Sequence, residues 1–471
     1  MKNILILIII LIFSSSVSVA QVPAEVYKRP LKEVLTDIEK RYNIKLQYSE
    51  NLVKGVDVLY PTWRYRSETE ATLTNILMPL DMIFQKTGEN VYQVSKYAYH
   101  VRPVEEGKKH LNILLSSYTS QAQWDARKKE LRNCFFEQLG LSPFPKKTTL
   151  NPIYTPKRQF DGYTVENVGL EVLPGVYLCG SLYRPVKGKG PFPAVLCPHG
   201  HFNSPDLNQY GRYRPDHQYR CAMLAKMGAV VFSYEMFAYG ESLLQVKTED
   251  HKTALALTMQ TLNSIRIIDY LSALPYVDPK RIGVTGESGG GTQTFLLTAL
   301  DDRVTVSVPV VMVSSWFFGG CACESGLPIH SCSELSTNNA EIAAMASPRP
   351  MLVISDGADW TQHVPTVEFP YLQRVYNLYG KQSNVENVHL ATEGHDYGVS
   401  KRMAMYDFMA KHLGLNINAV KDKSGKVDES GVTIEKYEAL LVFGKEGKLP
   451  STAVKGSDTI REILNSLQQG K

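Results

Sequence analysis

The stretch IGVTGESGGGTQTFLLTA, residues 282–299, decides the fold. It begins with a short apolar run typical of a buried strand and ends in a segment typical of a helix. Between them lies a G-x-S-x-G sequence centred on Ser288. The backbone of such a strand-to-helix turn is crowded, which accounts for Gly286 and Gly290 beside the serine. A glycine-rich turn without chemistry is the alternative, but the strand–turn–helix context predicts that Ser288 is a nucleophile.

Two later loops supply the partners that a serine nucleophile needs. A serine hydroxyl becomes reactive when a histidine takes its proton and a carboxylate orients that histidine. In a strand–turn–helix context the expected chain order is serine, acid, histidine, each after a later strand. The apolar run 351–355 leads into an aspartate-bearing loop, and the run 388–391 leads to His395. We therefore predict His395 as the base, with a surface-loop histidine as the alternative.

Two aspartates compete for the role of the acid. Asp359 lies in a Gly-x-Asp ending, one step further into the loop than Asp356. Asp356 is closer to the strand end and could cap the turn through its side chain. We favour Asp359, and we expect Asp396, beside the histidine, to be a loop residue.

The reaction also needs backbone N–H donors aimed at a developing oxyanion. One donor is expected from Gly289, directly after the nucleophile. The other is expected from the loop after the apolar run 193–197, where His201 would donate through its backbone. The side chains of His199 and His201 could be purely structural.

Strands and helices alternate through the rest of the chain. A hairpin is predicted over 163–183, and a linker-like stretch over 102–109 precedes a helix at 120–139. This alternation predicts an α/β fold with a mostly parallel sheet covered by helices on both faces. Further strands are predicted at 193–197, 229–233, 282–285, 304–313, 351–355 and 388–391, and helices at 254–274, 291–299 and 458–467.

The chain begins like an exported protein. Lys2 is followed by an apolar run about as long as a signal-peptide core, and Ser18-Val19-Ala20 offers small residues for cleavage before Gln21. Residues 1–20 are therefore predicted to be a signal peptide, and an uncleaved membrane anchor is the alternative. We expect export to the periplasm or the medium.

A small α+β module is predicted over residues 24–98. Helical spacing at 31–38 and 71–80 alternates with strands at 44–48, 56–59 and 63–65, and a hairpin over 82–94 turns at 88–90. Through LKEVLTDIEKRYNIKLQYSENLVKG, residues 31–55, the module resembles the short periplasmic N-terminal module of secretins and TonB-dependent receptors. The resemblance implies a binding or positioning role, with a protein as partner.

From about residue 124 to 414 the chain resembles an α/β-hydrolase of the acetylxylan-esterase-like kind. The stretches that carry this resemblance are PAVLCPHGH (193–201), GVTGESGGGTQTFLLTALDDRV (283–304), SDGADWT (355–361) and EGHDYG (393–398), together with 161–185. With the extra N-terminal module, the chain is similar to α/β-hydrolase-type pectin methylesterases. The resemblance places a catalytic domain at 105–415, and the tail 416–471 is expected to be an extension packed on it.

The resemblance implies a secreted serine ester hydrolase acting on plant cell-wall polysaccharide, with methyl-esterified galacturonate of pectin as the favoured substrate. One alternative is a carbohydrate O-acetyl esterase, and another is a non-catalytic binding or sensor protein. Neighbouring free uronates would call for arginines, because a guanidinium pairs with a carboxylate through two hydrogen bonds. Candidates for contact with such a substrate are Arg212, Arg214, Trp316, Trp360 and Tyr397, although each could equally be a surface or core residue.

Composition narrows the class of protein further. The 471 residues are 44% hydrophobic and 21% charged with a formal net charge of +4, which excludes a disordered tail and a polytopic membrane protein. The basic residues are scattered, so no nucleic-acid partner is expected. Cys134, Cys179, Cys197 and Cys221 are predicted to be buried free thiols. For the cluster of Cys321, Cys323, Cys332 and His330, a disulfide or simple packing is favoured over zinc, and we expect no metal and no cofactor.

Overall fold

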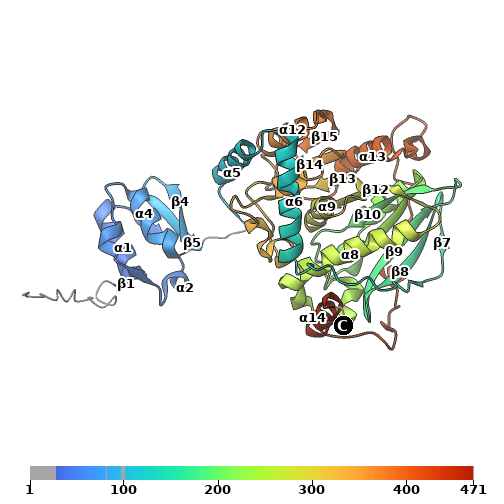
Figure 1. The fold of residues 1–471 in the computed structure, drawn as a ribbon, viewed down its shortest axis with the longest axis horizontal. Coiled ribbons are helices and arrows are strands. Elements are labelled where there is room, and N and C mark those ends of the chain that lie inside the picture. The colour runs from blue at the N-terminus through green and yellow to red at the C-terminus, as the bar shows by residue number, and fades with distance from the viewer. Residues whose placement is uncertain (1–27, 81, 97–100, 470–471) are drawn as a thin grey trace, which may run out of the picture. The chain divides into compact units, whose positions relative to one another are not determined.

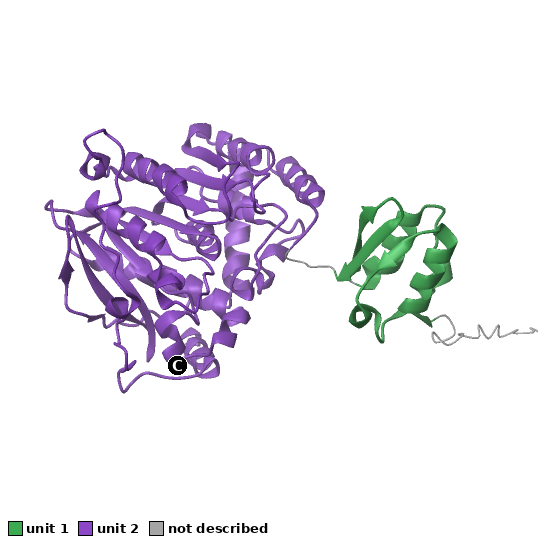
Figure 2. Cartoon of the chain, turned by 180° about the vertical axis from the view of Figure 1, so that it is seen from behind, with its two compact units in different colours: residues 1–99 green, residues 100–471 purple. Residues whose placement is uncertain are grey.

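The computed structural model describes residues 28–80, 82–96 and 101–469. The predicted signal peptide, residues 1–20, lies outside these ranges. The chain divides into two compact units, residues 1–99 and 100–471 (Figure 2). Each unit has its own hydrophobic core, so each is described by itself.

The smaller unit packs helices on short strands. α1 (Leu31–Tyr42) buries Leu31, Val34, Leu35 and Ile38, the stripe expected from the helical spacing. β1 (Lys28–Pro30) pairs with β3 (Asp57–Leu59), and β2 (Lys45–Gln47), β5 (Val91–Lys96) and β4 (Met82–Gly88) form a second sheet in that order. The remaining helices are α2 (Glu50–Val53), α3 (Pro61–Arg64) and α4 (Thr69–Leu77).

One predicted strand of this unit is wrong. Residues 63–65, expected to be extended, lie at the end of α3 and just after it. Pro61 occupies the first helical position, where its fixed φ favours a helix and its missing N–H costs nothing. The predicted hairpin is confirmed, since β4 and β5 pair antiparallel across residues 88–91.

A ten-stranded sheet runs through the larger unit (Figure 1). Its order is β15-β14-β13-β12-β10-β11-β9-β8-β6, with β7 also paired to β8. The strands from β10 to β15 pair parallel, whereas β9, β8, β7 and β6 add an antiparallel edge. Their bounds are β6 (Ile153–Tyr154), β7 (Arg158–Gln159), β8 (Tyr163–Leu173), β9 (Val176–Pro185), β10 (Phe192–Pro198), β11 (Val230–Tyr234), β12 (Val277–Glu287), β13 (Val304–Val310), β14 (Met351–Asp356) and β15 (Val385–Leu390).

Both faces of this sheet are buried. In β10, Ala194 and Leu196 belong to one hydrophobic cluster, while Val195 and Cys197 belong to another. Successive strand residues point to opposite faces, so the two clusters are the two covered sides of the sheet. One side is covered mainly by α5 (Val104–Ser117), α6 (Gln121–Gln138), α8 (Ala254–Ala273), α9 (Gly289–Leu300), α11 (Asn339–Ala344), α12 (Glu368–Asn377) and α14 (Ser457–Gln468), and the other by α7 (Pro215–Lys226) and α13 (Val399–Leu413). The predicted α/β class, with a mostly parallel sheet and helices on both faces, is confirmed.

Two expectations about connecting segments are corrected. The linker-like stretch 102–109 is largely the first part of α5, which begins after Pro103 and buries Leu111 and Leu114. Cys134, expected to be a free thiol, forms a disulfide with Cys332 and ties α6 to a loop 198 residues away in sequence. Neighbouring apolar residues mark a cysteine as buried but do not identify its partner, so the sequence could not distinguish the two states.

The C-terminal segment lies against the sheet. The backbone N–H groups of Val442 and Phe443 both donate to the carboxylate of Glu241 at 2.7 Å. α14 buries Ile460 and Leu464 in the larger of the two clusters. Residues 416–471 therefore complete the core of the unit that carries the nucleophile.

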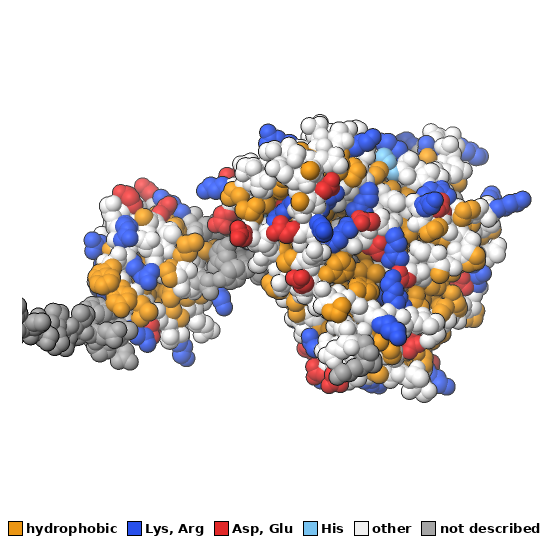
Figure 3. All heavy atoms as spheres, in the orientation of Figure 1, with side chains coloured by type: hydrophobic (Ala, Val, Ile, Leu, Met, Phe, Trp, Pro, Cys, Tyr) orange, Lys and Arg blue, Asp and Glu red, His pale blue; other side chains and the backbone are white. Residues whose placement is uncertain are grey.

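Among the described residues, none of the helices is both long and apolar enough to cross a membrane. On the face drawn in Figure 3, Lys and Arg side chains are interspersed with Asp and Glu. This pattern agrees with the scattered charges of the sequence.

Candidate active site

Ser288 lies at a strained turn between β12 and α9. Its φ of 55° and ψ of −123° are conformations that a residue with a side chain rarely adopts. A Cβ on Gly286 would lie 2.6 Å from the carbonyl oxygen of Pro198, and one on Gly290 would lie equally close to it. The prediction that these two glycines allow the backbone to crowd is confirmed.

A buried ion pair anchors the residue before the nucleophile. Glu287 contacts Arg220 at 2.7 Å, and both side chains are fully buried. The other carboxylate oxygen of Glu287 accepts from the N–H of Gly200 at 3.3 Å, and the guanidinium of Arg214 approaches it at 3.7 Å. Glu287 thereby ties the nucleophile turn to the loop after β10.

The predicted base and acid are joined directly. His395 Nδ1 lies 2.5 Å from Asp359 Oδ2. The other oxygen, Asp359 Oδ1, accepts from the N–H and the hydroxyl of Thr361, both at 2.6 Å. These bonds fix the carboxylate and direct the free imidazole nitrogen, Nε2, away from it. The side chain of His395 is 27% exposed, so solvent and substrate reach the imidazole.

Asp356 has a different role. Its carboxylate accepts from the N–H of Ala358 at 3.1 Å, the turn cap considered as its alternative role. It also lies 3.3 Å from the ammonium of Lys401, with both side chains buried. Lys401 contacts Asp396 at 2.7 Å, so Asp396 belongs to the same ion-pair group rather than to the His395 pair.

The sheet brings Ser288 and the His395–Asp359 pair to one edge. Ser288 follows β12, Asp359 follows β14 and His395 follows β15, and these strands are parallel. The carboxyl ends of parallel strands share an edge, which is where α/β folds place their sites. The arrangement can deliver a nucleophile, a base and its orienting acid to one substrate.

The N–H of Gly289 is at the first turn of α9, where backbone donors have no partner within the helix. The ring of His201 lies beside it, because a Cβ on Gly289 would be 2.5 Å from His201 Cε1. His199 is structural, since its Nδ1 donates to Gly200 O at 2.8 Å and its Nε2 accepts from Met236 N at 3.1 Å. Burial lowers the pKa of His199 to about 3, so it stays neutral.

Two of the substrate-contact predictions are wrong. Arg212 is 2% exposed, and its guanidinium is bonded to Glu235, Ser181 and the carbonyl of Leu440. Tyr397 is fully buried and its hydroxyl bonds Thr285 at 2.6 Å. Neither side chain can reach a substrate, because each is buried and hydrogen-bonded inside the core.

Three other candidates retain unpartnered polar atoms near the site. Arg214 stacks over Phe202 at 3.2 Å, and its Nη1 has no hydrogen-bond partner. The indole N–H groups of Trp316 and Trp360 also have none, and the ring of Trp360 lies 4.5 Å from that of His395. These nitrogens are buried, but each of the three side chains is only half-buried, so substrate contact stays a prediction for them.

One cluster of potential metal ligands was not predicted from the sequence. His201 and His251 meet Cys321 and Cys323, with one nitrogen or sulfur of each within 4.8 Å of the others. The group considered from the sequence instead included Cys332, which is in the disulfide, and His330, which bonds Asn339 at 2.8 Å. His251 lies 50 residues from the nearest member, so no spacing could identify it.

A serine at a strained strand-to-helix turn, with a histidine–aspartate pair at the same sheet edge, defines a serine ester hydrolase of the α/β-hydrolase fold. No protein-family model matches the sequence. A solved structure, methylesterase BT1017, is 44% identical, covers 94% of this chain and 99% of its own, and superposes with a TM-score of 0.80. The chain belongs to the family of this methylesterase.

Two curated proteins are more distant relatives. A 4-O-methyl-glucuronoyl methylesterase of Neurospora crassa is 24% identical over 351 residues, which are 66% of this chain and 83% of that protein. A putative hydrolase, YtaP, of Bacillus subtilis is 28% identical over 193 residues, which are 38% of this chain and 62% of that protein.

Proposed function

We propose that this enzyme is an exported esterase that removes methyl groups from esterified uronic acids in plant cell-wall polysaccharide, with methyl-esterified galacturonate of pectin as its substrate. The observation that carries the proposal is the 44% identity with a methylesterase over 94% of the chain. In this chain that similarity accompanies Ser288 at the strained turn and the 2.5 Å contact between His395 and Asp359.

The proposed reaction has two steps. The Oγ of Ser288 attacks the ester carbonyl while His395 Nε2 takes the serine proton, and the amides of Gly289 and His201 stabilise the oxyanion. The imidazolium, held by Asp359, then protonates the leaving methoxide, and methanol departs from a uronoyl-enzyme. Water activated by His395 attacks that ester and releases the uronate.

A methyl ester and an acetyl ester place the sugar on opposite sides of the ester bond. With a methyl ester the sugar is the acyl group attached to Ser288, whereas with an acetyl ester the sugar is the alcohol that leaves. We expect methanol release from methyl-esterified oligogalacturonides to exceed acetate release from acetylated xylan by at least about tenfold in kcat/KM, measured by mass spectrometry. Greater acetate release would refute the proposed substrate and favour the O-acetyl esterase alternative.

The Neurospora relative supports a second candidate, a 4-O-methyl-glucuronate ester. A methyl ester of 4-O-methyl-glucuronate is therefore the third substrate in the same assay. It shares the uronoyl acyl group with pectin but differs in ring stereochemistry. A higher kcat/KM on this ester would move the proposal from galacturonate to glucuronate without changing the chemistry at Ser288.

Arg214 is the side chain that we propose for recognition of a neighbouring free carboxylate. Its guanidinium, on a side chain 14% exposed, pairs with Asp216 at 3.0 Å, and its Nη1 approaches Glu287, the residue before the nucleophile, at 3.7 Å. We expect Arg214→Ala to raise KM about tenfold on partly methylated oligogalacturonide, because one charge-assisted hydrogen bond contributes about 1.5–3 kcal/mol. On fully methylated oligomer KM should change little. The matched control is Arg132→Ala, which removes an exposed pair with Asp302; an equal KM change on both substrates would contradict the assignment.

The proposed export is supported by the disulfide between Cys134 and Cys332, since such bonds persist in oxidising compartments. Cell fractionation of the full chain tests it, and a purely cytoplasmic location would refute it.

For residues 24–98 we propose a binding or positioning role. Deleting residues 21–100 should leave kcat/KM on soluble oligosaccharide unchanged, and a large loss would contradict a role separate from catalysis.

A further inference from the structure

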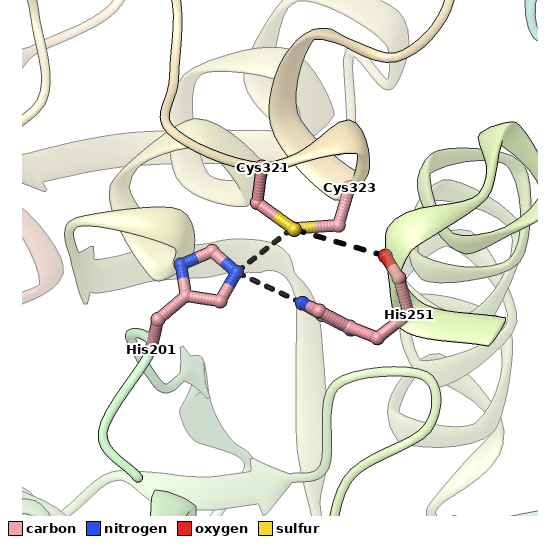
Figure 4. A group of neighbouring side chains, drawn as sticks. All are labelled: His201, His251, Cys321 and Cys323. Carbon is pink, nitrogen blue, oxygen red and sulfur yellow. Dashed lines mark hydrogen bonds between the residues drawn. The ribbon is translucent and has the colours of Figure 1, made fainter. Parts of the chain in front are cut away.

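His201, His251, Cys321 and Cys323 form a cluster whose side chains the proposed hydrolytic reaction does not use. Figure 4 shows four side chains converging from three segments of the chain. His201 comes from the loop after β10, His251 from a short 3-10 helix (Thr248–Lys252), and both cysteines from the start of α10 (Ala322–Ser325). We propose that these side chains bind one Zn²⁺ ion in a site with four protein ligands: His201, His251, Cys321 and Cys323.

The ligand types and distances fit this ion. Two imidazole nitrogens and two thiolates form one of the common tetrahedral zinc sites. Zn–S bonds of about 2.3 Å and Zn–N bonds of about 2.0–2.1 Å place tetrahedral ligand atoms roughly 3.3–3.8 Å apart. In the cluster the nitrogens of His201 and His251 are 2.9 Å apart, His201 Nε2 and Cys323 Sγ are 2.8 Å apart, and no pair of ligand atoms exceeds 4.8 Å. The two printed separations are shorter than this range and the 4.8 Å limit lies above it, so small side-chain shifts would bring the four atoms to tetrahedral positions.

The surroundings orient the ligands. His251 Nδ1 donates to the carbonyl of Phe237 at 2.6 Å, so in the neutral ring Nε2 carries a lone pair that faces the cluster. On the other side, His201 Nδ1 faces the buried carboxylate of Glu324 at 3.8 Å. Such outer partners fix the tautomer of a metal-binding histidine. The side-chain amide of Gln260, on α8, also donates a hydrogen bond to the backbone carbonyl of Cys323 at 3.2 Å.

Charge and redox state favour an ion over bare thiols. Zn²⁺ with two thiolates is neutral at the site, so its burial with Cys323 and His251, at 0% and 5% exposure, carries no uncompensated charge. In an exported protein two neighbouring free thiols would be open to oxidation, and thiolate ligation protects them.

Four protein ligands leave no open position, so the ion would be structural. It would hold the ring of His201 against Gly289, the proposed oxyanion donor, and would link three loops at the catalytic edge.

Metal analysis of the purified full chain tests this proposal. We expect about one Zn²⁺ per chain after dialysis, and the removed ion should be replaceable by Co²⁺ with the intense visible absorption of a tetrahedral two-thiolate site. Cys321→Ser with Cys323→Ser should abolish metal retention, whereas the matched control Cys179→Ala, another buried free cysteine, should retain it. His251→Gln serves as the second variant if the double variant does not fold, and it should weaken Co²⁺ binding at least tenfold.

Thiol titration separates the metal site from a disulfide. After denaturation in chelator without reductant, the proposal predicts that the five cysteines outside the Cys134–Cys332 disulfide all react. Two fewer reactive thiols would mean that Cys321 and Cys323 are joined, which would overturn the proposal. Failure of the wild-type protein to retain either Zn²⁺ or Co²⁺ would overturn it too. Metal retention and thiol titration do not depend on esterase activity, so failure of the zinc proposal can be distinguished from failure of the proposed substrate.

Discussion

Ser288→Ala is expected to lower kcat on a methyl-esterified substrate by about 10⁴-fold or more, because the acyl-enzyme can no longer form. A residual rate from the oxyanion donors and from substrate binding would remain. The measurement is methanol release at saturating substrate. Ser466→Ala, on the exposed face of α14, is the matched control and should keep full activity. A fall of less than about tenfold in the Ser288 variant would refute its role as nucleophile.

The same position makes a prediction about stability. The backbone of Ser288, at φ 55° and ψ −123°, is strained for any residue that has a Cβ. Ser288→Ala keeps that strain, whereas Ser288→Gly relieves it. We therefore expect Ser288→Gly to unfold with a free energy about 1 kcal/mol higher than Ser288→Ala, measured by urea denaturation, with both variants inactive. Equal stabilities would contradict strain at this turn.

The placement of Ser288, Asp359 and His395 at one sheet edge could be predicted from the sequence, because the signals for each loop are local. Strand, turn and glycine spacing lie within a few residues of Ser288, and the later apolar runs identify the loops of Asp359 and His395. Those loops reach one sheet edge because parallel strands share their carboxyl ends. The alternation of strand-like and helix-like segments predicted the fold class. The parallel sheet from β10 to β15 was therefore predictable, although the bounds of its strands shifted by a few residues.

What could not be predicted depends on contacts across the chain. Arg212 and Arg214 are two residues apart in one loop, yet one is fully paired in the core and the other keeps an unpartnered nitrogen. Arg212 pairs with Glu235, which directly follows β11, whereas Arg214 pairs with Asp216, two residues further along the chain. Cys134 and Cys332 form a disulfide across 198 residues, and His251 joins Cys321 across 70. Sequence spacing carries no information on such pairs.

Asp359→Asn is expected to lower kcat by about 10³–10⁴-fold with little change in stability. The reason lies in Thr361, whose N–H and hydroxyl both donate to Asp359 Oδ1. In Asp359→Asn the amide oxygen would keep those two bonds, so the NH₂ group would face His395 Nδ1. That nitrogen would then have to accept, which places the imidazole proton on Nε2, where it cannot take the proton of Ser288.

Asp356→Asn is the matched comparison from the same loop, and it should behave in the opposite way. It weakens the partner of a fully buried lysine, Lys401, which keeps its contact with Asp396. We expect a loss of about 1–3 kcal/mol in the free energy of unfolding but less than about tenfold in kcat, because this carboxylate is not the one bonded to His395. Measuring kcat and urea unfolding for both variants separates the roles. If Asp356→Asn lost more activity than Asp359→Asn, the assignment of the acid would be reversed, since the hydrogen bond at 2.5 Å would then not be the one that orients the base.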